Sequence, residues 1–277
     1  MSVSAAHEKQ RRLDAILREM GSVAVAFSGG VDSAYLAVRA HRVLGERALA
    51  VTADSPSLAS AQRDTALGLA RDFGFAHRVV LTAEVDDPLY ARNDADRCFH
   101  CKTELFRHLA PIAAAEGYRH LAYGAIVDDL SDFRPGHRAA ADAGVRSPLV
   151  EAEMTKADVR ELSREMGLPT WDLPASPCLS SRIPRGTAVT PEILRQVERA
   201  EEAVRALGFR ELRVRHLGET ARVEIAPVEL ARLDAERRAA VERAVLAAGY
   251  RACLIDPNGY RRGRLNEPLP LTVIGPA

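Results

Sequence analysis

The sequence has no excess of either charge: 38 Lys and Arg residues match 38 Asp and Glu residues, so the formal net charge at pH 7 is +0. Proteins that bind long nucleic acids usually carry an excess of Lys and Arg, so the composition does not favour such a partner. No apolar run approaches the ~18 residues that a membrane-spanning helix needs. Residues 1–12 are polar and lack the apolar core of a secretory signal. These absences favour a cytoplasmic protein without a membrane partner.

Cysteine is scarce, with four residues among 277. In the reducing cytoplasm, four thiols are not expected to form structural disulfides, so metal binding or reactivity is the better expectation. Hydrophobic residues make up 47% of the chain and charged residues 27%, which excludes a disordered protein. The length is sufficient for two domains of ordinary size.

The first half of the chain alternates short apolar runs with longer amphipathic segments, which predicts an α/β fold with an open, mainly parallel sheet. The expected strands are residues 23–27, 48–52, 77–81 and 120–123. The expected helices are an opening helix that carries Leu13, Ile16, Leu17 and Met20, followed by 32–44, 57–73 and 103–116. Thr155 and Asp158 form a capping box, which predicts a further helix start.

Prolines become frequent after the first half of the chain, and they interrupt regular structure. The segment 169–190 is therefore predicted to be a proline-rich loop that separates a domain of residues 1–168 from a smaller α+β domain of residues 191–277. The smaller domain is expected to contain helices at 191–207 and 236–247 and strands at 212–216, 221–225 and 251–255.

The segment SGGVDS, residues 28–33, follows a buried strand and opens a helix. Its glycines allow a tight turn close to an anion, its serines add hydroxyl donors, and the helix start favours a phosphate. The loop lacks Lys, so it differs from the loop of enzymes that transfer the terminal phosphate of ATP or GTP. Asp32 is a candidate ligand for Mg²⁺. The candidate nucleotide-binding residues here are Ser28, Gly29, Gly30, Val31, Asp32 and Ser33.

Ala53 and Ser55 follow the second expected strand, at the carboxyl edge where open α/β sheets bind ligands. They are candidate adenosine contacts, and an ordinary turn is the alternative interpretation.

Cys98 and Cys101 form a CxxC pair just before the helix expected at 103–116, and this spacing lets both sulfurs face one metal or cluster. Cys178 lies in the proline-rich segment, whereas the apolar neighbours of Cys253 are typical of a buried small hydrophobe. Three uses of the first three thiols remain open. They are a zinc site with His100 as fourth ligand, a redox pair with a persulfide on Cys178, or a [4Fe–4S] cluster with one iron open to a non-protein ligand.

The SGGVDS loop resembles that of the PP-loop ATP pyrophosphatases, which cleave ATP between the α- and β-phosphates. Seven segments, in order, extend the resemblance over nearly the whole chain: SGGVDS, AVTADSPSL, RCFHCKTELF, DDLSDFRPG, GVRSPL, PCLSSRIPRG and RVRHLGETARVEI. Together they resemble the LarE-type ATP-dependent sulfur transferases of nickel-pincer nucleotide biosynthesis, which are associated with lactate racemase activation. The resemblance implies the PP-loop α/β fold with a smaller C-terminal α+β domain.

The resemblance also implies a reaction. ATP, with Mg²⁺, would adenylate the carboxylates of pyridinium-3,5-biscarboxylic acid mononucleotide, and sulfur would then replace AMP to give thiocarboxylates. In one branch of the family, a cysteine that matches Cys178 gives up its own sulfur. The CxxC pair matches the other branch, in which Cys98, Cys101 and Cys178 are thought to hold a [4Fe–4S] cluster that carries sulfide. The family tends to form homo-hexamers, and the source of the sulfide is not implied.

Charged residues elsewhere are candidates to bind the anionic substrate or ATP. Arg213 and Arg215 alternate along an expected strand and should point to one face, with solvent-facing arginines as the alternative. The candidate substrate ligands are Arg182, Arg213 and Arg215. The other candidates are Lys102 for catalysis and Arg97, Gly124 and Asp128 for the nucleotide.

One segment departs from the family pattern. Many relatives read GTNxDD after the fourth strand, but here Ala125 and Ile126 replace the Thr and Asn, so their contacts cannot be assigned. Asp128, Asp129 and Arg134 still match the pattern.

Two other interpretations remain. A tRNA thiolation enzyme would combine the same loop with cluster cysteines, but it needs a basic surface for RNA. A non-catalytic nucleotide-binding or iron–sulfur carrier protein would bind the same groups without turnover.

Overall fold

The structure is a computed structural model that describes residues 4–130 and 135–261. The chain divides into two compact units, Met1–Cys178 and Leu179–Ala277, and the division falls within the segment 169–190. Arg134 lies outside the described residues.

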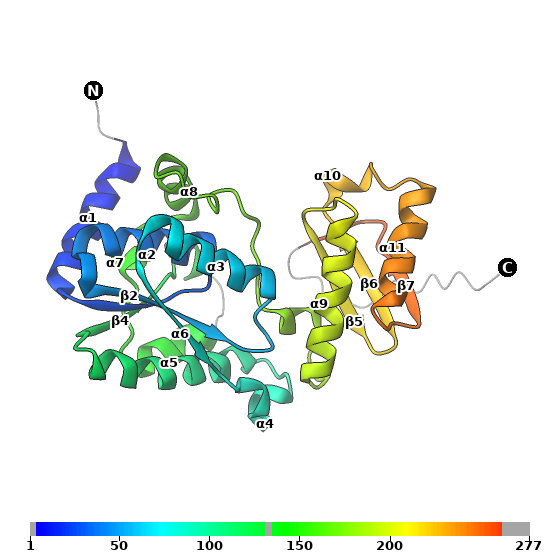
Figure 1. Ribbon diagram of the computed structural model, residues 1–277, viewed down its shortest axis with the longest axis horizontal. Helices are drawn as coiled ribbons and strands as arrows, with labels where there is room; N and C mark the ends of the chain where they lie inside the picture. Colours follow the sequence, from blue (N-terminus) through cyan, green and yellow to red (C-terminus); the bar gives the residue numbers. More distant parts are fainter. Residues whose placement is uncertain (1–3, 131–134, 262–277) are drawn as a thin grey trace. The chain divides into compact units, whose positions relative to one another are not determined.

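The first unit contains a four-stranded parallel sheet with the order β3-β2-β1-β4 (Figure 1). Its strands are β1 (Val23–Ala26), β2 (Ala48–Asp54), β3 (Ala76–Leu81) and β4 (His120–Tyr123). Ala26 pairs in register with Val51 of β2 and Tyr123 of β4, so the carboxyl ends of β2, β1 and β4 lie at the same edge of the sheet. The expected α/β fold with a parallel sheet is confirmed.

Helices cover both faces of this sheet (Figure 1). One face is covered by α1 (Ala5–Met20), α2 (Val31–Leu44), α3 (Ser60–Phe73), α7 (Pro148–Glu151) and α8 (Lys156–Glu165). The other face is covered by α5 (Arg97–Ala115) and α6 (Pro135–Asp142). Because side chains of a strand alternate between faces, Val25 contacts the first layer and Ala26 the second.

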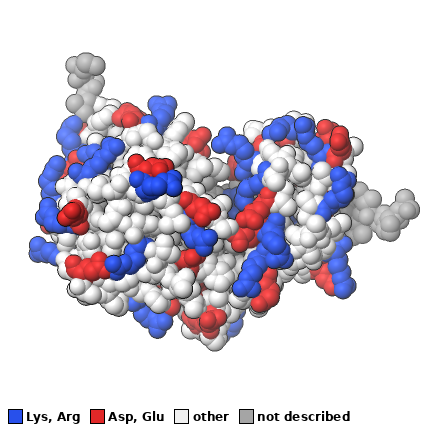
Figure 2. Space-filling view, in the orientation of Figure 1, with Lys and Arg blue, Asp and Glu red and all other residues white. Residues whose placement is uncertain are grey.

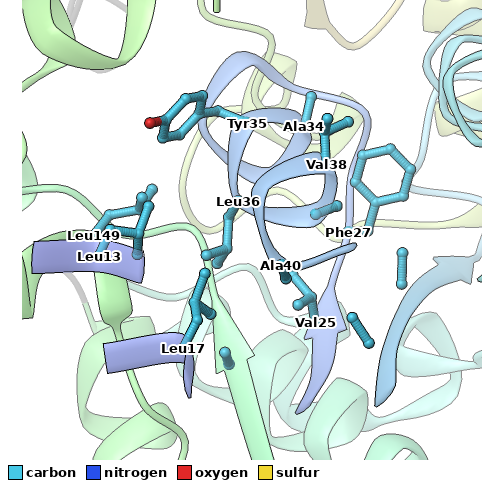
Figure 3. Packing of buried hydrophobic residues seen from close by; sticks show 14 of the residues in the cluster. Leu13, Leu17, Val25, Phe27, Ala34, Tyr35, Leu36, Val38, Ala40 and Leu149 are labelled. Atoms are coloured by element: carbon cyan, nitrogen blue, oxygen red, sulfur yellow. The ribbon is translucent and has the colours of Figure 1, made fainter. Parts of the chain in front are cut away.

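The larger core explains why the opening segment is helical. Leu13 and Leu17 lie one turn apart on α1 and share a face, beside Leu36 of α2 and Val25 of β1 (Figure 3). Both leucines are 0% exposed, and burial of each contributes about 1.5–3 kcal/mol to folding. The α1 helix therefore depends on its apolar stripe for its position on the sheet.

The second unit contains a three-stranded sheet with the order β5-β6-β7. Its elements are α9 (Pro191–Ala206), β5 (Leu212–Leu217), β6 (Thr220–Ile225), α10 (Pro227–Leu230), α11 (Ala235–Ala247) and β7 (Ala252–Ile255). Val214, Val223 and Val241 belong to its core, and the half-buried Cys253 packs against that core. Burial raises the pKa of Cys253 to about 12, so this thiol is a poor nucleophile at neutral pH.

Several short elements had no counterpart among the predictions. They are the helices α4 (Pro88–Ala91), α6, α7 and α10 and the turns η1 (Gly45–Arg47), η2 (Glu84–Asp86), η3 (Val127–Asp129) and η4 (Leu179–Arg182).

The prediction that the CxxC pair precedes a helix is wrong. Helix α5 begins at Arg97, so Cys98 and Cys101 lie on its first turns. Acidic residues just before the helix, including the N-cap Asp96, interact favourably with the positive end of the helix dipole. This interaction allows the helix to begin before the cysteines. Residues three apart share a helix face, so the helix itself directs both thiols to one side.

Acidic and basic side chains are interspersed over the face shown in Figure 2, which has no continuous basic surface. Among residues 4–130 and 135–261, no helix combines the length and apolar character needed to cross a membrane.

Candidate active site

The glycine loop joins the central strand β1 to α2. Gly29 has φ 74°, and a Cβ at this position would lie 2.9 Å from the carbonyl oxygen of Gln62. Both the conformation and the available space therefore require glycine. Gly30 is the N-cap of α2, and no side chain caps this helix, so its first amides remain suited to an anion.

Hydrogen bonds within the loop distinguish its two serines. Ser33 Oγ donates to the carbonyl oxygen of Gly30 at 3.2 Å and accepts from the amide of Ser28 at 3.2 Å. The Ser33 hydroxyl thus holds the loop closed. Ser28 is exposed, and its Oγ lies 3.1 Å from that of Ser33. Ser28 is therefore the better placed of the two hydroxyls to meet a ligand.

A lysine from a distant helix reaches this loop. Lys156 Nζ donates to the two carboxylate oxygens of Asp32 at 2.9 and 2.7 Å, across 124 residues of sequence. Burial raises the pKa of Asp32, and Lys156 acts in the opposite direction. Sequence reasoning missed Lys156. The only signal was the capping box of Thr155 and Asp158, which the structure confirms and which fixes Lys156 as the first residue of α8.

Other residues near this ion pair have structural contacts. Asp128 accepts a hydrogen bond from the Lys156 amide at 2.9 Å and so helps to hold the start of α8. A Cβ on Gly124 would lie 2.8 Å from the amide nitrogen of Ser33, so the end of β4 and the start of α2 can approach only with glycine here. Arg160, one turn after Lys156, lies within electrostatic reach of Asp32.

The departure from the family pattern is accommodated by burial. Ala125 and Ile126 are 4% and 3% exposed, so apolar side chains suit both positions. The amide of Ile126 donates to the Asp129 carboxylate at 3.2 Å, which closes the turn without a Thr or Asn side chain.

The loop after β2 lies at the same edge of the sheet. Ala53 pairs with Val80 of β3, so its backbone belongs to the sheet. The hydroxyl of Ser55 donates to Glu84 at 2.6 Å. The hydroxyl of this candidate adenosine contact is therefore already engaged within the protein.

The first unit places the three candidate cysteines in one region. Burial lowers the pKa of Arg97, but interactions with Cys178 and Cys98 outweigh it and raise the pKa. Burial also raises the pKa of the Cys101 thiol, and Cys178 adds to this effect. Cys178 thus lies within electrostatic reach of the CxxC helix, although about 75 residues of chain separate them. The four cysteines form no disulfide in the described chain.

A preassembled zinc site is absent from this region. Among the described residues, the only group of three His, Cys, Asp or Glu ligand atoms within 4.8 Å of one another is the surface set His7, Glu161 and Glu165. His100 instead faces two carboxylates, with its ring nitrogens 3.9 Å from Asp87 and 3.3 Å from Asp96.

Lys102 lies near the carboxyl edge of the sheet. Its Nζ is 5.7 Å from the centre of the Tyr123 ring and 6.0 Å from that of Phe106. Tyr123 ends β4, in register with the end of β1. Two aromatic rings thus hold the ammonium group near this edge, in keeping with a role toward an anion.

In the second unit, the predicted arginines are buried, so the alternative of solvent-facing arginines is wrong. Arg182 forms a bidentate pair with Glu201, with distances of 2.8 and 3.1 Å, which ties η4 to α9. Arg215 donates to Glu224 at 2.9 Å. Arg213 stacks on Tyr260, with 4.9 Å between its guanidinium carbon and the ring centre. Burial lowers the pKa of Arg213, and Arg182 lowers it further.

Arg222 is a further member of this group that sequence reasoning missed. It lies on β6 directly opposite Arg215, so both project from one face of the sheet. Arg222 is 3% exposed, and its Nε has no hydrogen-bond partner in the described chain. Its Nη2 lies 2.9 Å from Glu224 Oε1, close enough for an ion pair but poorly directed for a hydrogen bond. Both arginines pair with Glu224, so two buried positive charges share one carboxylate on this face.

The parallel sheet and the lysine-free glycine loop define an α/β protein of the PP-loop class. No protein-family model matches the chain. Over 94% of its length and 95% of the relative, it is 36% identical to pyridinium-3,5-bisthiocarboxylic acid mononucleotide synthase of Lactiplantibacillus plantarum. It is 40% identical to an uncharacterized protein of Synechocystis sp., over 94% of this chain and 98% of that protein.

A more distant similarity is confined to part of the chain. One of the subunits of the glutamine-hydrolyzing GMP synthase of Methanocaldococcus jannaschii is 29% identical over 52% of this chain and 50% of its own length. The near-complete match to the synthase decides the assignment. The chain belongs to the LarE-type family of pyridinium-3,5-bisthiocarboxylic acid mononucleotide synthases, and the prediction that it is an enzyme is confirmed.

Proposed function

We propose that this enzyme uses ATP to adenylate the carboxylates of pyridinium-3,5-biscarboxylic acid mononucleotide and then replaces AMP with sulfur. The observation that carries the proposal is the Asp32–Lys156 ion pair beside the glycine loop. It places a cation and a carboxylate next to the uncapped start of α2, where an anion is favoured. The name of the 36% identical relative, a bisthiocarboxylic acid mononucleotide synthase, supports the choice of substrate.

The chemistry explains why ATP is needed. A carboxylate resists sulfur attack because its oxygen is a poor leaving group. In the first step, a carboxylate oxygen bonds to the α-phosphorus of ATP and the bond to pyrophosphate breaks. In the second step, sulfur bonds to the activated carbonyl carbon, and the bond to AMP breaks.

The glycine loop is proposed to hold the phosphates. The first amides of α2 and the hydroxyl of Ser28 would donate to phosphate oxygens, and Lys156 would neutralise the charge that develops on the leaving pyrophosphate. Asp32 fits a Mg²⁺ ligand, because it offers carboxylate oxygens and lies within electrostatic reach of a second carboxylate, Asp129. When bound, Mg²⁺ would neutralise the same leaving group.

The cysteines are proposed to supply the sulfur. Cys101 interacts electrostatically with both Cys98 and Cys178, and Cys98 and Cys101 lie on one helix face, so the three thiols fit a cluster with three protein ligands. Cys98, Cys101 and Cys178 would hold the [4Fe–4S] group, which would supply an open iron for sulfide. Arg97 would stabilise negative charge on the two cysteines with which it interacts.

The arginine face of the second unit is proposed to bind an anionic group of the substrate. Arg213, Arg215 and Arg222 project from one buried face of the small sheet together with Glu224, so three positive charges face one negative charge there. Planar guanidinium groups suit phosphate and carboxylate oxygens. The buried pair of Arg182 and Glu201 would then support this face without binding the substrate.

The proposal is tested by measuring pyrophosphate and AMP with purified enzyme, ATP, Mg²⁺ and a sulfide source. We expect both products to form in equal amounts, and only when pyridinium-3,5-biscarboxylic acid mononucleotide is present. Formation of ADP, or of pyrophosphate without the pyridinium substrate, would contradict the proposal. Nucleotide binding without turnover under these conditions would favour a carrier or sensor protein.

A further inference from the structure

Glu84 is a buried carboxylate without an assigned role. It begins η2 and is 4% exposed. Three hydroxyl groups donate to it: Ser55 at 2.6 Å and Ser57 at 2.5 Å to one oxygen, and Thr82 at 3.0 Å to the other. In the described part of the chain, no Lys, Arg or His forms an ion pair with Glu84. The three hydroxyls are therefore its principal stabilising contacts.

Such an arrangement is costly unless the hydrogen bonds are kept. A buried carboxylate loses its hydration, and short hydroxyl–carboxylate bonds replace it only while each donor stays in place. The donors come from two segments, because Ser55 and Ser57 follow β2 and Thr82 follows β3. Glu84 thus links the two loops more firmly than apolar contacts would.

The first of these loops borders the glycine loop. The amide of Phe27 donates to the carbonyl oxygen of Val51 at 2.8 Å. In turn, the hydroxyl of Thr52 donates to the carbonyl oxygen of Phe27 at 2.7 Å. Strand β2 is therefore fixed to the start of the glycine loop. Residues 54–58 lie at the end of β2. Their conformation therefore decides which of their groups lie next to a nucleotide bound at the glycine loop.

The other side of Glu84 faces the cysteine helix. The short helix η2 contacts α5, and Glu84 lies within electrostatic reach of Cys101. One buried side chain thus stands between the loop at residues 54–58 and the helix that carries the CxxC pair.

We propose that Glu84 is a positioning residue that holds the loop at residues 54–58 in the conformation that binds the adenosine of ATP. This inference rests on the proposed function. Because the Ser55 and Ser57 hydroxyls are committed to Glu84, the backbone of the loop is presented to the nucleotide in one arrangement. Loss of the carboxylate releases both serine hydroxyls and lets the loop adopt other conformations.

The test compares Glu84→Ala and Glu84→Gln with the wild type in pyrophosphate release driven by the pyridinium substrate. We expect Glu84→Ala to raise the KM for ATP by about tenfold or more, with a smaller fall in kcat, because bonds to a charged acceptor are lost. Glu84→Gln keeps an acceptor of the same length and should restore most of the affinity. Direct titration with a non-hydrolysable ATP analogue should rank the affinities of the three enzymes in the same order.

Glu104→Gln is the matched control. Glu104 is a carboxylate of α5 that bonds to His108 at 2.9 Å, away from the nucleotide loop, and its change should leave the KM for ATP unaltered. If Glu84→Ala does not fold, Ser57→Ala removes one donor and should raise the same KM by a smaller factor.

An unchanged KM for ATP in a folded Glu84→Ala enzyme would overturn the inference, whether or not its melting temperature falls. Absence of substrate-dependent pyrophosphate release from the wild type would instead contradict the proposed function. The two failures are therefore distinguishable.

Discussion

Replacing Cys178 by Ala is expected to lower thiocarboxylate formation by on the order of a thousandfold or more, as the loss of an essential nucleophile or ligand does. About one equivalent of pyrophosphate per active site should still be released, because the glycine loop and Lys156 are unchanged, whereas AMP stays on the adenylate without sulfur to displace it. The physical reason is that the two steps use different groups: adenylation needs phosphate ligands, whereas displacement of AMP needs sulfur near the activated carbonyl. Mass spectrometry of the pyridinium product, with a parallel assay for pyrophosphate, checks both steps.

Cys253→Ala provides the control, since Cys253 packs against the core of the second unit and its thiol pKa is raised to about 12. That variant should form thiocarboxylate at the wild-type rate. Undiminished product from the Cys178 variant would show that the sulfur takes another route. The intact mass of the wild type after turnover separates the two routes through this cysteine, because a sacrificed thiol leaves the protein lighter by H₂S.

Replacing Lys156 by Ala is expected to lower kcat/KM for pyrophosphate release by about a hundred- to a thousandfold, the range typical of losing a positioned electrostatic group. Lys156 contacts both carboxylate oxygens of Asp32, so its loss removes a cation from the phosphate loop and also frees that carboxylate to repel the phosphates. Lys156→Arg keeps the charge and should retain more activity than Lys156→Ala. Steady-state assays of pyrophosphate at varied ATP measure the effect.

The control for this change is Lys9→Ala. Lys9 also pairs with a carboxylate of the first unit, Asp158 of α8, at 2.6 Å, but it does not contact the glycine loop. Its removal should affect the melting temperature more than turnover. A Lys156→Ala enzyme with wild-type kcat/KM for ATP would remove Lys156 from the proposed mechanism.

Local signals predicted most of the fold. Apolar periodicity placed the opening helix, because Leu13 and Leu17 share a face, and the capping box of Thr155 and Asp158 marked the start of α8. The start of α5 was missed, because the CxxC segment has no apolar stripe and its helix depends on the acidic residues before it. Strand order depends on pairing across tens of residues, which periodicity alone does not reveal.

The candidate site was predictable where its residues are adjacent in sequence and not where they meet through folding. The glycine loop and the CxxC pair can be recognised from the spacing of neighbouring residues in the sequence. Lys156 and Glu84 have no such local pattern. Lys156 reaches its partner across 124 residues, and Glu84 is identified only by the hydroxyls that surround it in the fold. Arg222 has a weaker signal, since it lies opposite Arg215 in a hairpin whose register follows from the turn.

The most direct test of acyl adenylation follows oxygen from the substrate carboxylate. Pyridinium-3,5-biscarboxylic acid mononucleotide labelled with ¹⁸O in its carboxylates is incubated with the enzyme, ATP and a sulfide source, and the mass of the AMP is measured by mass spectrometry. If the carboxylate oxygen attacks the α-phosphorus and later leaves with AMP, each AMP formed carries one ¹⁸O. Unlabelled AMP alongside thiocarboxylate would contradict the account.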